Sequence, residues 1–480
     1  MIFWLAFLIC STGIAGLFFL DRDPSTRNSK ALWLPVMWLW IAGSRPTSSW
    51  FGMGASGASV LASTLDGSPM DAAVFAALIV AGIIVVFLRR DRTIPLLKAN
   101  GPVLIYLLYC LISITWSPIP EPAFKRWTKD LGDVVMVLIL ATDGQPIAAL
   151  RRLYSRLGFI LLPFSVVLIR YTDLGRAFTP DGEPMNTGVT LNKNALGLIV
   201  FLVSLGALWN LRALLIDKEA PNRKRRFVAQ GTLLTFGLVL LQMAHCATAI
   251  ACFILGGGLI LATSLRAIRT RPVRVHALCL VIVLGGGLTV LLGGQSMVTN
   301  ALGREENLTG RTDIWAAAIA AADNPIIGTG FESFWNTNVE KVARALPGYW
   351  EIHNLVSAHN GYLEVYLNLG LVGVCLIARI LISGYRHAIK TFQRDPELGS
   401  LILAYIAACT IYGITEAGFR LLAPSWIFLL LAVVSASGVV EGLFDVAPET
   451  AAASGSVQRP QFLRRPNKVI KPSRSTTSLL

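Results

Sequence analysis

The feature that most constrains this 480-residue chain is a series of apolar runs, each near the length needed to cross a membrane. A helical span needs about 20 mainly apolar residues, and in lipid its backbone polar groups must be satisfied within the segment. We therefore predict an all-α, polytopic transmembrane helical bundle of about 12 or 13 spans. The clear runs are 3–20, 72–88, 103–116, 157–169, 195–211, 231–243, 247–265, 275–292, 362–383, 400–414 and 426–440, and the weaker ones are 31–42 and 133–141.

The charged residues agree with this class. Only 15% of the chain is charged, against about 25% in soluble globular proteins. The net charge of +14 could indicate a nucleic-acid partner, but the basic residues cluster in short loops separated by two apolar runs each, which is the positive-inside pattern. No nucleic acid is expected. The basic groups lie at 89–98, 151–156, 218–226, 266–274, 386–394 and 459–474.

The positive-inside pattern predicts a multi-pass protein of the bacterial inner membrane, with the basic loops and the C-terminus in the cytoplasm. The intervening loops, including a long one at residues 294–360, then face the periplasm. The expected domains are N-terminal transmembrane helices (1–293), a large periplasmic loop with two amphipathic helices (294–360), C-terminal transmembrane helices (361–443) and a disordered cytoplasmic tail (444–480).

The long loop has helical patterning. Residues 311–322 predict one amphipathic helix, and residues 332–346 predict a second. The apolar stripe of the first helix is Ile314, Trp315, Ala318, Ile319 and Ala322. Loops longer than about 15 residues are usually functional or disordered, and this patterning favours a function. The seven cysteines and five histidines show no ligand spacing, so we expect neither a metal nor another cofactor.

The long loop returns to the membrane at His359. Asn360 is a predicted N-cap for the next span, and Glu364 in its first turn suits the helix dipole. The positive helix end favours a neutral imidazole, which is the form a general base needs. From these residues alone, a histidine such as His359 is more often a capping or interface residue than a catalyst. An arginine such as Arg311 is usually solvated, and a tryptophan such as Trp315 is more often an interfacial anchor than a ligand.

Several strings of residues occur in a familiar order. Leu308-Thr309-Gly310-Arg311-Thr312-Asp313-Ile314-Trp315 precedes Asn324-Pro325 with Gly328-x-Gly330, and His359-Asn360 precedes Gly370-Leu371-Val372-Gly373. Trp116-Ser117-Pro118 with Arg126, and Leu191-Asn192-Lys193-Asn194, come earlier. Together they resemble the O-antigen ligase/polymerase family (Wzy-type, exopolysaccharide polymerase-like) of bacterial membrane glycosyltransferases, over roughly residues 100–440.

The resemblance implies a fold like the GT-C-type membrane glycosyltransferases and a specific reaction. A polyprenyl-pyrophosphate-linked glycan donor is transferred to a glycan acceptor on the periplasmic face, with inversion and without a metal. Membrane lipid is a further partner, and a flippase and a chain-length regulator of the same pathway would be others. The resemblance favours a polymerase. The alternative is an O-antigen ligase, which transfers the finished glycan to lipid A core or another acceptor.

The resemblance also implies roles for individual residues. His359 would be the base, and Arg311 would bind the diphosphate, whose oxygens match a guanidinium fork. Arg176 and Lys193 are candidate further cations, as is Arg126, for which interface anchoring is an equal alternative. The sequence departs from the family at His245, where relatives carry Arg or Lys. The supporting residues are Asn360, Asn194 (equally a helix N-cap), Glu364, Trp315 and His245.

Two other classes of protein remain open. A secondary transporter commonly has ionisable residues within its spans and internal repeats, and we find neither pattern. Asp133 and Glu416 lie near span ends, and we interpret both as interfacial side chains. A non-catalytic scaffold for polysaccharide assembly is the third class, and substitutions of Arg311 and His359 would test it.

Overall fold

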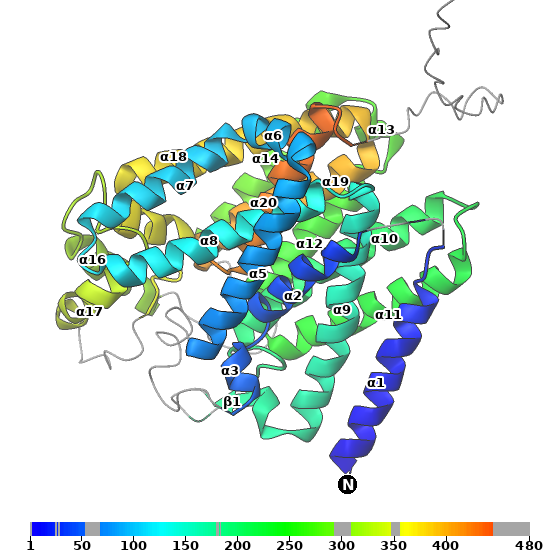
Figure 1. The fold of residues 1–480 in the computed structure, drawn as a ribbon, viewed down its shortest axis with the longest axis horizontal. Coiled ribbons are helices and arrows are strands. Elements are labelled where there is room, and N and C mark those ends of the chain that lie inside the picture. The colour runs from blue at the N-terminus through cyan, green and yellow to red at the C-terminus, as the bar shows by residue number, and fades with distance from the viewer. Residues whose placement is uncertain are drawn as a thin grey trace, which may run out of the picture. The chain divides into compact units, whose positions relative to one another are not determined.

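The computed structural model of the protein is a bundle of helices with a single short hairpin in its described part (Figure 1). The structure describes residues 2–24, 26, 29–52, 68–178, 182, 184–291, 309–346 and 356–444. The predicted disordered tail, apart from Phe444, lies outside these residues, as does Leu308 of the family string. Pro347-Gly348, the pair predicted to end the second loop helix, also lies outside them. The prediction of an all-α polytopic membrane protein is confirmed.

The helices follow the apolar runs of the sequence. Their bounds are α1 Ile2–Leu20, α2 Trp33–Ala42, α3 Thr47–Trp50, α5 Pro69–Leu88, α6 Arg90–Ala99, α7 Gly101–Ser113, α8 Pro120–Ala141, α9 Pro146–Tyr171, α10 Lys193–Ile216, α11 Arg223–Ala244, α12 Ala247–Ala262, α13 Arg266–Arg269, α14 Pro272–Leu291, α16 Thr309–Ala320, α17 Phe334–Ala345, α18 Gly361–Arg394, α19 Pro396–Thr415 and α20 Pro424–Val440. The 3-10 turns are η1 Lys30–Leu32, η2 Ile114–Trp116 and η3 Asp173–Gly175, and the strands β1 Arg176–Phe178 and β2 Pro184–Asn186 pair antiparallel.

The number of spans differs from the prediction of 12 or 13. Among the described residues, seven helices are long and apolar enough to cross a membrane, and an eighth span results if α6 and α7, bent by 85°, count as one. Four other predicted runs form apolar helices of 10–17 residues, among them α20. The weak run 133–141 is the apolar half of α8, whose first half is charged.

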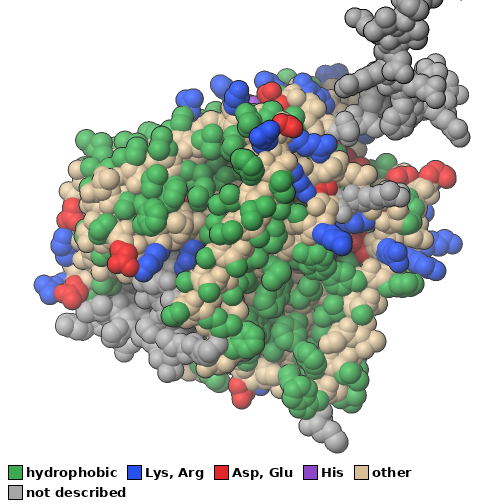
Figure 2. Space-filling view, in the orientation of Figure 1, with side chains coloured by type: hydrophobic (Ala, Val, Ile, Leu, Met, Phe, Trp, Pro, Cys, Tyr) green, Lys and Arg blue, Asp and Glu red, His purple; other side chains and the backbone are tan. Residues whose placement is uncertain are grey.

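The centre of the bundle is formed by α19 and α20. Nearly every side chain of α20 is buried, and α19 is almost as enclosed. A helix that is apolar all round belongs in the interior, whereas α1 leaves most of its apolar side chains exposed. Figure 2 shows apolar side chains over much of one face of the molecule, with Lys and Arg gathered along its upper edge and right side.

Asp133 lies inside this bundle, so its interpretation as an interfacial side chain is wrong. Its side chain is fully buried within α8, where it accepts hydrogen bonds from Trp38 Nε1 at 2.7 Å and from the Leu422 backbone N–H at 2.9 Å. The carboxylate therefore fixes the connection between α19 and α20 against α2 and α8. A buried carboxylate is tolerated when such hydrogen bonds satisfy it.

The long loop is joined to α18 where that helix is broken. Gly370 has φ +65°, outside helical geometry, and a Cβ added there would lie 2.2 Å from the Ile326 backbone. Four backbone hydrogen bonds of 2.8–3.2 Å join residues 325–330 to residues 367–372. The break exposes carbonyl and N–H groups that a continuous helix would use internally, and the loop satisfies them.

Candidate active site

The two predicted helices of the long loop are present as α16 and α17. They form a small core of their own with the first turns of α18, through residues such as Ile314, Phe334 and Leu367. The predicted apolar stripe of α16 is only partly correct. Ile314 and Ala318 of the predicted stripe are buried, but Ile319 is 51% exposed, and Ala317, which was not predicted, is buried beside them.

Three polar side chains from separate segments meet at Glu416, the residue that follows α19. Glu416 Oε1 accepts a hydrogen bond from Asn194 Nδ2 at 2.9 Å and lies 3.4 Å from Arg311 Nη2. Its Oε2 lies 3.2 Å from His359 Nδ1. We call Asn194, Arg311, His359 and Glu416 the Glu416 cluster. Glu416 thus lies at the end of an apolar helix, as predicted, and its side chain is enclosed by protein contacts.

The Glu416 cluster has an inner and an outer part. The Glu416 side chain is 10% exposed, whereas the side chains of Arg311 and His359 are 26% and 44% exposed. Arg311 is held further by a hydrogen bond from Nη1 to the Thr415 carbonyl at 2.7 Å. The Glu416 carboxylate thus lies behind the Arg311 guanidinium and the His359 imidazole. These two groups reach the surface, where a ligand could approach.

The backbone around His359 fixes the direction of the imidazole. His359 has φ +49°, an uncommon conformation for a residue with a side chain, and its N–H donates to Ser357 Oγ at 3.0 Å. Asn360 then caps α18 by accepting from the N–H groups of Tyr362 and Leu363, as predicted. Strained backbone of this kind concentrates at functional sites.

Both backbone polar groups of Ala358, the residue before His359, are hydrogen-bonded to side chains. Its carbonyl accepts from Trp315 Nε1 at 2.7 Å, and its N–H donates to Glu364 Oε1 at 2.5 Å. Glu364 is buried and also accepts from Trp335 Nε1 at 2.9–3.0 Å, so it does more than complement the helix dipole. Trp315 and Glu364 therefore position the segment that carries His359.

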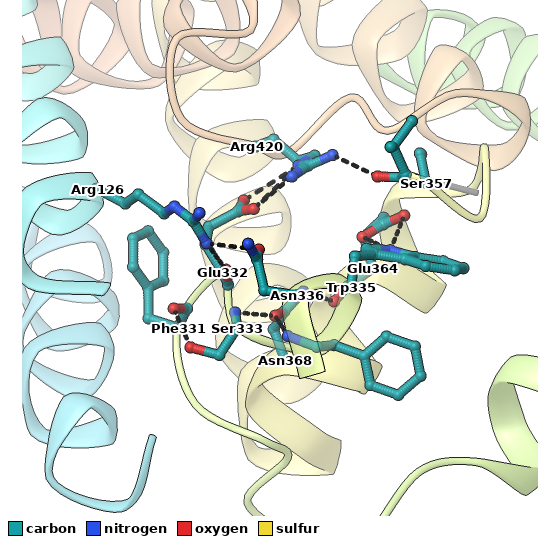
Figure 3. A network of polar contacts seen from close by, with 12 residues as sticks. Arg126, Phe331, Glu332, Ser333, Trp335, Asn336, Ser357, Glu364, Asn368 and Arg420 are labelled. Carbon is teal, nitrogen blue, oxygen red and sulfur yellow. Dashed lines mark hydrogen bonds and ion pairs between the residues drawn. The ribbon is translucent and has the colours of Figure 1, made fainter. Parts of the chain in front are cut away.

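A second polar network fixes the long loop to the connection between α19 and α20 (Figure 3). Arg420 Nη2 and Glu332 Oε2 are 2.6 Å apart, and Arg420 Nη1 donates to the Val356 carbonyl at 3.3 Å. Burial alone would lower the pKa of Arg420, but Glu332 and Glu364 outweigh burial and raise it, so the guanidinium stays charged. Neither Arg420 nor Glu332 was identified from the sequence.

Arg126 belongs to this second network. Its side chain is fully buried, and Nη1 donates to the Glu332 carbonyl and to Asn336 Oδ1, the latter at 3.0 Å (Figure 3). These contacts tie α8 to the start of α17. A guanidinium enclosed by protein is placed to position the loop, and neither an interfacial anchor nor a ligand-facing cation would be so buried.

The structure places the other two predicted cations, Lys193 and Arg176, on different elements. Lys193 opens α10 directly beside Asn194. Arg176 is half-exposed at the start of β1, where it lies 3.5 Å from Asp173. Among the described residues, no hydrogen bond or ion pair links Arg176 to Arg311 or His359.

The turn that departs from the family pattern is next to the cluster. His245 is exposed at the end of α11 with φ +48°, and α12 begins two residues later. Thr248 Oγ1 lies 3.2 Å from Thr415 Oγ1, so the turn packs against the residue before Glu416. A cation in this turn would lie close to the Glu416 cluster, and this chain has His245 in the turn.

Comparison with known proteins agrees with this architecture. The model of the family described as O-Antigen ligase matches residues 230–378, a range that contains Arg311 and His359. Over this range the chain resembles the O-antigen ligase/polymerase family, and the predicted resemblance is confirmed. It is also 27% identical over 318 residues to the "Exopolysaccharide production protein ExoQ" of Rhizobium meliloti (strain 1021), covering 63% of this chain and 68% of that protein.

Proposed function

We propose that this protein polymerises polyprenyl-pyrophosphate-linked oligosaccharide repeat units in exopolysaccharide or O-antigen biosynthesis, on the periplasmic face of the bacterial inner membrane. The observation that carries the proposal is that Glu416 contacts both His359 and Arg311. Exopolysaccharide as the product is supported by the name of the Rhizobium meliloti relative. A flippase and a chain-length regulator of the same pathway are its proposed partners.

The geometry supports His359 as general base. Nδ1 faces the Glu416 carboxylate, which favours the tautomer with a proton on Nδ1 and leaves Nε2 as the acceptor. In the proposed step, Nε2 takes the proton of the acceptor hydroxyl while that oxygen attacks the anomeric carbon of the donor. The bond from this carbon to the diphosphate oxygen breaks, and its electron pair leaves with the diphosphate. A single displacement inverts the anomeric configuration.

Arg311 is proposed to bind the departing diphosphate. A guanidinium places two parallel donors against phosphate oxygens, and a fixed cation is most effective where charge develops during the reaction. The side chain is held by Glu416 and Thr415 yet remains partly exposed. Lys193, which opens α10 beside Asn194, is proposed as a further contact, as are Arg176 and His245.

The alternative function is transfer of a finished glycan to lipid A core or another acceptor. The description of the matching family as O-Antigen ligase supports it. Both reactions use the same base and the same leaving group, so the Glu416 cluster serves either one. The acceptor alone separates the two.

Cells that lack this protein distinguish the two functions. The lipid-linked glycan pool is extracted and resolved by size, next to the surface polysaccharide. A polymerase predicts single repeat units on the lipid carrier and no long chains. Long chains that persist on the carrier, without reaching their final acceptor, would identify a ligase. An unchanged pool and unchanged polysaccharide would contradict both.

A further inference from the structure

An apolar cavity of about 270 Å³ lies beside the Glu416 cluster. Its walls come from the end of α2, the start of α5, the first turns of α10 and the connection between α19 and α20. We call it the α2/α10 cavity. Residues that define it include Ile41, Phe75, Ala195, Leu198, Leu421 and Pro424.

The charged residues in the walls of the α2/α10 cavity are already paired. Asp71 accepts from the Ser48 N–H at 2.9 Å and from Ser48 Oγ at 2.5 Å. Arg420 is bound to Glu332 at 2.6 Å. The surface left for a ligand is therefore mainly apolar, and a polar group placed there would lose its hydrogen bonds to water.

The cavity and the Glu416 cluster share two segments of chain. Ala195 of the cavity follows Asn194 of the cluster, and Ala417 of the cavity follows Glu416. An apolar space thus adjoins a site that presents a guanidinium and an imidazole. A ligand complementary to both has an anionic head and an apolar body joined directly to it.

We infer that the α2/α10 cavity binds the isoprenoid segment next to the diphosphate of the donor. This inference rests on the proposed function, because it names the part of the lipid-linked substrate that the cavity receives. The diphosphate lies at Arg311, and the lipid continues between α2 and α10. The sugar then projects toward His359.

The test uses the full-length protein in lipid nanodiscs and farnesyl diphosphate, a short isoprenoid diphosphate, as the probe. Ala195→Leu and Leu198→Trp fill the cavity, and Leu215→Trp on the exposed side of α10, where Leu215 is 54% exposed, is the matched control. Loss of contact with about two methylene groups corresponds to about tenfold in affinity. The cavity variants should raise the Kd by about tenfold or more, and the control should not.

Inorganic pyrophosphate separates the cavity from the diphosphate site. It lacks the isoprenoid, so its competition with the probe at Arg311 should weaken in Arg311→Gln and stay unchanged in the cavity variants. A Kd for farnesyl diphosphate that is unchanged in both cavity variants but raised in Arg311→Gln would overturn the cavity assignment and leave the proposed function intact. No binding of the probe to the wild type would contradict both.

Photolabelling keeps the test decisive if a cavity variant fails to fold. The wild-type protein is labelled with farnesyl diphosphate that carries a diazirine on its isoprenoid, and the modified peptides are mapped. Labels within residues 195–198 or 421–424 are expected. Labels confined to other helices would overturn the inference.

Discussion

Glu416 Oε2 lies 3.2 Å from His359 Nδ1, and the two residues are 57 positions apart in the chain. The same carboxylate contacts Arg311 and Asn194. It therefore orients both His359, the proposed base, and Arg311, the residue proposed to bind the diphosphate. An acidic residue behind a histidine fixes its tautomer and its direction. We therefore propose Glu416 as a positioning residue that acts through His359 and Arg311.

Replacement of Glu416 by Gln should reduce kcat by about 10²-fold or more, because the amide no longer fixes the Nδ1–H tautomer of His359. The KM for the lipid-linked donor should change less than kcat. Glu416→Asp, which keeps the charge, should recover part of the activity. Steady-state kinetics on the purified protein measure this split, and a change in KM alone would show that Glu416 acts only through Arg311.

Arg311→Gln should reduce kcat/KM for the donor by about 10²–10³-fold, because a fixed cation no longer meets the departing diphosphate. Arg311→Lys should recover little, since an ammonium lacks the two-donor fork. The matched control is Arg344→Gln on α17, whose side chain is 80% exposed and pairs with Glu340. Equal losses in Arg311→Gln and Arg344→Gln would argue for a general effect of loop charge.

The ion pair between Arg420 and Glu332 should contribute to stability more than to chemistry. Their side chains are 13% and 7% exposed, and removal of one partner of a buried pair costs about 3–5 kcal/mol. Arg420→Ala should therefore lower the Tm and speed proteolysis within residues 294–360. The double variant with Glu332→Leu should regain part of that loss. A Tm equal to the wild type would show that water replaces the pair.

Gly370→Ala should separate the long loop from α18. The new Cβ would lie 2.2 Å from the Ile326 backbone, and φ +65° adds about 1–3 kcal/mol of strain for a residue with a side chain. Gly258→Ala in α12 is the control, because a Cβ there meets nothing within 4 Å. Melting curves should show a lower Tm for the Gly370 variant only. The same Tm in both variants would contradict the role given to the break.

Local signals in the sequence predicted the elements around the site. The cap at Asn360 and the two loop helices follow from residue types within one or two turns of each other. Arg311 and His359 were singled out through the family resemblance, and the structure brings them to one carboxylate. Their catalytic roles remain predictions.

Glu416 was missed because its meaning depends on residues far away in the chain. Its partners are 57, 105 and 222 positions distant, so no periodicity or motif connects them. An acidic residue at the end of an apolar run looks interfacial in sequence. Its enclosure follows from the packing of α10 and α18 against α19 and from Arg311 of α16, which reaches the end of α19. The burial of Asp133 and Arg126 escaped prediction for the same reason.

The most direct test of the account is the elongation of a lipid-linked repeat unit by purified protein carrying His359→Ala. The variant should bind the donor as the wild type does, because Arg311 and the α2/α10 cavity are unchanged. Its rate of chain elongation should fall by about 10²–10⁴-fold, the contribution of a general base. Elongation at the wild-type rate by a folded His359→Ala protein would contradict the central claim.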